Sequence, residues 1–62
     1  MIKVLIVEDE NFIRKGLIGT FDWVSCDCTV IGEAENGVIG LEKIINLNPD
    51  LVITDIKMPR MN

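Results

Sequence analysis

The chain has 62 residues, a formal net charge of −4, and a composition that is 48% hydrophobic and 26% charged. This length allows one small domain, and the composition indicates a globular chain rather than a disordered one. The negative charge is a poor match to a nucleic-acid surface. Because no apolar run approaches the roughly 20 residues of a membrane span and no signal peptide opens the sequence, we expect a cytoplasmic protein with no membrane partner.

The first predicted element is a strand from Ile2 to Val7, whose nearly continuous apolar run is typical of a strand covered on both faces. Three acids follow it directly: Glu8, Asp9 and Glu10. The next segment, from about Asn11 to Phe21, has apolar residues at helical spacing. Its predicted buried stripe consists of Ile13, Leu17, Ile18 and Phe21. We predict Asn11 as the N-cap, with Arg14 and Lys15 on the solvated side.

The middle of the chain contains an aromatic residue, two cysteines and a second strand. Trp23 is expected to cover the end of the first helix as an apolar plug. Cys26 and Cys28 are the only cysteines in a chain without histidine, so we expect two reduced thiols rather than a zinc site. The segment from Cys28 to Ala34 is predicted to give a short second strand around Thr29, Val30 and Ile31.

A second helix is predicted from about Gly37 to Leu47, with Asn36 as its N-cap. Its expected buried residues are Val38, Leu41, Ile44 and Ile45, and the residues expected to face water are Glu42, Lys43 and Asn46. Gly40 interrupts this helix, so close packing on the sheet is expected there. A stop signal at Asn48–Asp50 precedes a third strand from Leu51 to Thr54.

These elements alternate as β-α-β-α-β, which predicts an α/β fold with a parallel sheet and right-handed crossovers. The carboxyl ends of parallel strands form the ligand face of such a sheet. Glu8 and Asp9 follow the first strand and Asp55 follows the third, so these carboxylates are expected to converge. A nucleotide-binding enzyme is disfavoured because the chain has neither a P-loop nor a G-x-G-x-x-G motif.

Converging acids need a compensating partner, since two carboxylates about 4 Å apart repel by about 4 kcal/mol at an effective dielectric constant of 20. One acid can take up a proton, or a hard cation can bind. Mg²⁺ fits best, because it accepts one or two carboxylates and uses its remaining positions for water and phosphate oxygens. An aspartate beside such an ion can act as a nucleophile toward a phosphoryl group. Alternatively, Glu8 and Asp9 only cap the following helix, and Asp55 only forms a turn.

Three motifs make the whole chain resemble the receiver domain of bacterial two-component response regulators. They are VLIVEDE at 4–10, GEAENG at 32–37 and PDLVITDIKMP at 49–59. The resemblance implies a flavodoxin-like fold with strand order 2-1-3, and a signalling domain rather than an enzyme. It implies that Asp55 accepts a phosphoryl group from a histidine kinase. It also implies that Glu8, Asp9, Asp55 and the backbone carbonyl of Lys57 bind Mg²⁺.

The resemblance covers only part of the family's pattern. Residues 1–62 are expected to be a partial receiver domain, the first three strands and two helices, without the family's later Ser/Thr and Lys. The segment 21–23 resembles regulators with an AraC-type DNA-binding output domain, so DNA contact is expected only through such a domain. The alternative is a binding or dimerisation module that never carries phosphate. A homodimer is expected through the exposed edge of the third strand, Leu51 to Thr54.

Overall fold

The structure is a computed structural model that describes residues 1–54 of the chain. The elements in chain order are β1 (Ile2–Val7), α1 (Asn11–Thr20), the 3₁₀ turn η1 (Val24–Cys26), β2 (Cys28–Ala34), α2 (Gly37–Leu47) and β3 (Leu51–Thr54). The three strands form a parallel sheet in the order β2-β1-β3. The predicted alternation and strand order are therefore confirmed, as are the bounds of the first and third strands. β2 is longer than the predicted short strand around Thr29, Val30 and Ile31.

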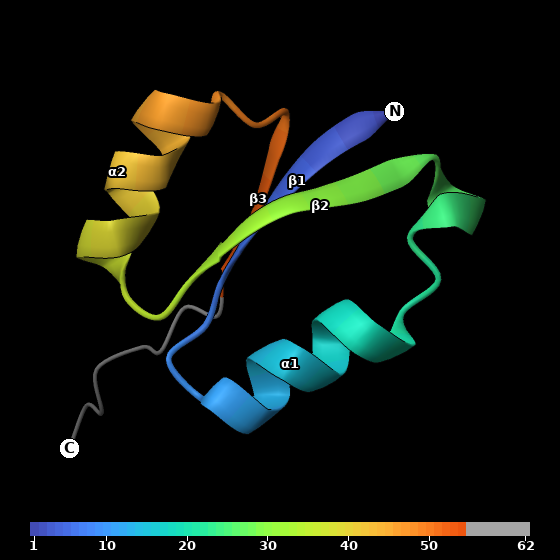
Figure 1. The fold of residues 1–62 in the computed structure, drawn as a ribbon, viewed down its shortest axis with the longest axis horizontal. Coiled ribbons are helices and arrows are strands. Elements are labelled where there is room, and N and C mark those ends of the chain that lie inside the picture. Colours follow the sequence, from blue (N-terminus) through green and yellow to red (C-terminus); the bar gives the residue numbers. More distant parts are fainter. Residues whose placement is uncertain (55–62) are drawn as a thin grey trace, which may run out of the picture.

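The two helices lie on opposite sides of the sheet, as Figure 1 shows. On the α1 side, buried Val4, Ile6 and Cys28 pack against Leu17, Ile18 and Trp23. On the α2 side, buried Leu5, Val7 and Ala34 pack against Ile39. Because successive strand residues point to opposite faces, the continuous apolar run of β1 supplies both layers at once. β1 is thus the covered central strand that its sequence predicts.

The residues at the ends of the helices make the local contacts that their types favour. The Asn36 side chain accepts a hydrogen bond from the Ile39 N–H at 2.9 Å, which confirms the predicted N-cap of α2. Asn48 ends α2 in the left-handed region, with φ of 50°, and its N–H donates to the Ile44 carbonyl at 3.0 Å. Trp23 packs beyond the end of α1 and donates from Nε1 to the Ile18 carbonyl at 3.2 Å, as a plug would.

The orientation of α1 differs from the prediction. Arg14 is buried with 8% of its surface exposed, whereas Ile13 is 53% exposed and Phe21 is 47% exposed. Leu17 and Ile18 of the predicted stripe do pack against the core, but the third residue of the inner face is Arg14, which has i, i+3, i+4 spacing with them. The first turn of α1 lies against the polar carboxyl end of β1, where Arg14 finds hydrogen-bond acceptors that Ile13 cannot use.

The predicted N-cap of α1 is also wrong. Asn11 is the first helical residue, Glu10 occupies the cap position, and Glu10 makes no side-chain capping bond. The Asn11 Oδ1 instead accepts a hydrogen bond from Arg14 Nη2 at 2.7 Å. The side chain that could have capped the helix is therefore used to hold the buried guanidinium.

The predicted buried stripe of α2 is wrong in the described part of the chain. Its four members are exposed, as the fractions for Val38, Leu41, Ile44 and Ile45 show: 75%, 59%, 36% and 73%. Gly40 is the buried residue of α2, and an added Cβ would lie 2.9 Å from Val7 Cγ2. This contact confirms the close packing predicted at Gly40. It also decides the rotation of α2, because the helix approaches β1 most closely where it has no side chain.

The remaining features of the described residues are a groove beside α2, the two cysteines and the hydropathy of the helices. Leu41 and Ile44 line an open, mostly apolar groove between α2 and Val52 of β3. Cys26 and Cys28 are both free thiols, as predicted, with Cys26 exposed and Cys28 buried. Within residues 1–54, neither helix has the length and hydropathy that a membrane-spanning segment requires.

Candidate phosphoacceptor site

The carboxyl ends of the three strands are level with one another. Val7, the last residue of β1, is in register with Ala34 at the end of β2 and with Thr54 at the end of β3. The Glu8 N–H extends this ladder by donating to the Ala34 carbonyl at 2.9 Å. Because the strands are parallel and end together, the residues that follow them leave the sheet at one edge.

A cavity of about 280 Å³ opens at this edge. Its lining consists of Val7, Glu8, Asp9, Glu35, Asn36, Gly37 and Thr54. Glu8 and Asp9, the two acids predicted to converge after β1, therefore lie at a common cavity with the last described residue of β3. Asp55 and Lys57, the other predicted site residues, lie outside the described residues.

The side chains around this cavity suit a hard cation such as Mg²⁺. Glu8, Asp9, Glu35, Asn36 and Thr54 all offer oxygen atoms, and none of the lining residues is a cysteine or histidine. Among residues 1–54 there is no group of three or more acidic, cysteine or histidine side chains that could by itself hold a metal ion.

Glu8 is anchored rather than freely solvated. Only 7% of its surface is exposed, and its Oε2 accepts a hydrogen bond from the Glu10 N–H at 2.9 Å. A burial this deep for a carboxylate is unusual unless the group is hydrogen-bonded or paired. The hydrogen bond from Glu10 therefore holds the Glu8 carboxylate within the short turn after β1.

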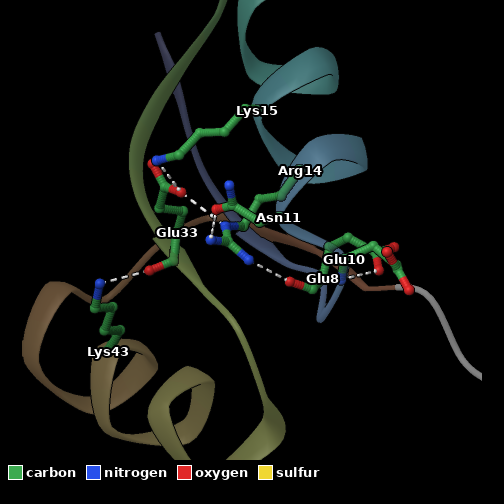
Figure 2. Close-up of polar contacts among 7 residues, drawn as sticks. All are labelled: Glu8, Glu10, Asn11, Arg14, Lys15, Glu33 and Lys43. Atoms are coloured by element: carbon green, nitrogen blue, oxygen red, sulfur yellow. Dashed lines mark hydrogen bonds and ion pairs between the residues drawn. The ribbon is translucent and has the colours of Figure 1, made fainter.

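Arg14 is the residue of this region that the sequence reasoning missed. Figure 2 shows its guanidinium between the end of β1, the first turn of α1 and β2. Its Nη1 donates to the Glu8 carbonyl at 2.7 Å, and its Nε donates to Glu33 Oε1 at 2.7 Å. The available signal was the i, i+3, i+4 spacing of Arg14 with Leu17 and Ile18, which places all three on one face.

Glu33 of β2 accepts hydrogen bonds from side chains of both helices. Its Oε1 accepts from Arg14 and, at 2.8 Å, from Lys15 Nζ, while its backbone carbonyl accepts from Lys43 Nζ of α2. The hydrogen bonds from Lys15 and Arg14 hold the pKa of the Glu33 carboxyl below its ordinary value of 4.5. Lys43, which was predicted to face water, is half-buried through this contact.

The lowered pKa predicts a pH-dependent effect of Glu33→Gln. A carboxyl whose pKa is depressed by folding stabilises the fold above its unfolded pKa, and this contribution disappears as the pH falls through the folded pKa. We expect Glu33→Gln to be less stable than the wild type at about pH 7, and the difference to shrink as the pH falls below about 4.5. Urea unfolding of both proteins over this range measures it. A difference that is constant with pH would contradict the prediction.

The fold and the cavity together define a class of protein. A parallel sheet in the order 2-1-3, with a helix on each side and acids at the carboxyl edge of its central strand, is a truncated flavodoxin-like α/β fold, and its cavity lies at the edge where open α/β sheets bind ligands. The family model of the response regulator receiver domain matches residues 4–62. The chain belongs to this family, the receiver domains of two-component signal transduction.

Curated relatives agree with this family and show its range. The chain is 44% identical over 62 residues to the uncharacterized transcriptional regulatory protein YesN of Bacillus subtilis. The matched region is all of this chain and 17% of that protein. It is 45% identical over 62 residues to the transcriptional regulatory protein HptR of Staphylococcus aureus, again over the whole of this chain and 25% of the relative. It is also 44% identical over 61 residues to a protein-glutamate methylesterase/protein-glutamine glutaminase of Symbiobacterium thermophilum, over 98% of this chain and 17% of that protein.

The chain therefore spans between 17% and 25% of the length of these relatives. Their names differ in the activity of the whole protein, from transcriptional regulation to ester and amide hydrolysis. What they share with this chain is the receiver segment. Its role in signalling follows from the family, whereas the activity of any attached part does not.

Proposed function

We propose that this chain is the phosphoacceptor part of a response regulator, which takes a phosphoryl group from a histidine kinase onto Asp55. The observation that carries the proposal is the register of Val7 with Thr54, because β1 and β3 end at the same edge of the sheet and Glu8, Asp9 and Thr54 line one cavity there. The family membership supports the same role. We further propose that residues 1–62 form the first three strands and two helices of the receiver domain.

In the proposed reaction, a carboxylate oxygen of Asp55 attacks the phosphorus of a phosphohistidine. A new O–P bond forms, the P–N bond breaks, and its electron pair returns to the imidazole nitrogen, which takes a proton from solvent. Glu8 and Asp9, with Asp55 and the Lys57 backbone carbonyl, are the proposed Mg²⁺ ligands. Bound Mg²⁺ would neutralise charge on the phosphoryl oxygens in the transition state. The proposed role is that of a phosphoacceptor and not of an independent enzyme.

The direct test is labelling of the intact protein by acetyl phosphate in the presence of Mg²⁺. We expect one alkali-labile phosphate, mapped to Asp55 by mass spectrometry, and no labelling of Asp55→Asn because an amide cannot act as the nucleophile. Asp50→Asn is the matched control, since Asp50 lies at the opposite end of the sheet and hydrogen-bonds the Lys3 backbone. Labelling of Asp55→Asn at the wild-type rate would refute the assignment.

The predicted homodimer through β3 is a second proposal, which concerns the 62-residue chain. In the described residues, β3 pairs with β1 on one side, and Leu51 is 44% exposed. An edge of this kind is a template for pairing with a second strand. We expect light scattering to show a dimer and Val52→Pro to weaken it, because proline removes a donor from the strand. A stable monomer would contradict this proposal and leave the phosphoacceptor role untouched.

The output of the signal is also part of the proposal. A DNA-binding domain attached to the receiver would account for the transcriptional names among the relatives, and DNA contact is proposed only through such a domain. The AraC-type output and the cytoplasmic location remain predictions from the sequence.

A further inference from the structure

Arg14 is a buried cation whose donors are used in three different directions. Nη1 binds the Glu8 carbonyl, Nη2 binds Asn11 Oδ1 and Nε binds Glu33 Oε1, each at 2.7 Å. The acceptors belong to the turn after β1, to the start of α1 and to β2, as Figure 2 shows. A guanidinium can serve three such acceptors because its donors form a rigid planar fork, which the compact ammonium of lysine does not have.

The bond to the Glu8 carbonyl acts on both acids of the proposed metal site. The peptide unit from Glu8 to Asp9 is planar, so its carbonyl oxygen and the Cα atoms of both residues lie in one plane. A donor that fixes the direction of this carbonyl therefore restricts how the peptide unit that joins the two acids can turn. The Arg14 backbone N–H donates to the Glu10 carbonyl at 2.9 Å, so Arg14 contacts the residue after Asp9 as well as the residue before it.

Arg14 does this without placing an uncompensated positive charge beside a cation site. Its Nε lies 2.7 Å from a carboxylate oxygen of Glu33, which Lys15 also contacts. Glu33 thus balances the guanidinium and holds it from the β2 side. Lys15 reaches the same Glu33 oxygen from an exposed position, where 57% of its side-chain surface is open to solvent.

We propose that Arg14 is a positioning residue that orients the Glu8–Asp9 peptide for divalent-cation binding, with Glu33 as its anchor. This inference rests on the proposed function, because it assigns Glu8 and Asp9 to the metal. Partners one step removed from metal ligands commonly change metal affinity by 10- to 100-fold when they are mutated. Arg14 would therefore tune the affinity for the cation rather than the phosphoryl-transfer step itself.

The test compares Arg14→Lys with Lys15→Gln in the intact protein, using Mn²⁺ as the probe. We expect Arg14→Lys to raise the Mn²⁺ dissociation constant, measured by electron paramagnetic resonance, by about tenfold. The Mg²⁺ concentration for half-maximal labelling by acetyl phosphate should rise by the same factor, with the labelling rate at saturating Mg²⁺ unchanged. Lys15→Gln, which removes only the exposed Glu33 pair, should leave Mn²⁺ affinity within about twofold of the wild type.

The outcomes separate this inference from the function on which it rests. If Asp9→Asn loses Mn²⁺ binding but folded Arg14→Lys keeps wild-type affinity, the positioning role is overturned and the proposed function stands. If the wild type neither binds Mn²⁺ nor accepts phosphate, both are overturned. Should Arg14→Lys not fold, Glu33→Ala carries the test, because it removes the anchor without touching the turn. Retained folding with about threefold to tenfold weaker Mn²⁺ binding supports the inference, and unchanged binding overturns it.

Discussion

Asp9→Asn is expected to abolish the stabilisation of the fold by Mg²⁺. A ligand that binds only the folded state stabilises it by about 2.7 kcal/mol when its concentration is 100 times the dissociation constant. The wild-type melting temperature should therefore rise with Mg²⁺, whereas that of Asp9→Asn should not.

The measurement is a series of thermal melts of the intact protein with increasing Mg²⁺. Glu42→Gln is the matched control, because it also neutralises one acid but lies on an exposed position of α2 and not in the cavity lining. The control should respond to Mg²⁺ as the wild type does. An equal response in Asp9→Asn would exclude Asp9 from the ligand set. A general charge effect would instead reduce the response of both variants.

Gly40→Ala is expected to destabilise the fold even though alanine is the better helix former. An ideal Cβ at position 40 would lie 2.9 Å from Val7 Cγ2 and 3.4 Å from Val7 Cγ1. Val7 is buried and β-branched, so its side chain has little freedom to move aside. Overpacking of this kind typically costs about 1–3 kcal/mol, which offsets the gain of up to about 1 kcal/mol in helix propensity.

Gly19→Ala is the matched control, since it makes the same change in α1 where nothing lies within 4 Å of the added Cβ. It should stabilise the protein by about 0.4–1 kcal/mol, mainly by restricting the unfolded chain. Urea unfolding should therefore show that the two substitutions change the free energy of unfolding in opposite directions. Two stabilising substitutions would show that α2 is not held against β1 at Gly40.

Local sequence determined the elements of this protein and their ends. The continuous apolar run of β1 indicated a strand covered on both faces, and Asn36 and Asn48 marked the two ends of α2 through capping geometry. Alternation of strands and helices then indicated a parallel sheet, which places residues after β1 and β3 at one edge. The family motifs pointed to the same edge. The caps of α2 depend on contacts within a few residues of one another, and the alternation of elements is a pattern along the chain, so both can be read from the sequence.

Tertiary contacts alone decided which way each helix faces. Both helices carry apolar residues on more than one side, so helical spacing left several stripes open, and the predicted ones were wrong at Ile13 and Val38. The rotation of α2 follows from the absent side chain of Gly40 against Val7. The rotation of α1 follows from Arg14, which is buried because Glu8 and Glu33 supply acceptors from distant parts of the chain. Sequence alone predicts that a charged residue faces solvent. The acceptors that allow its burial come together only when the sheet forms.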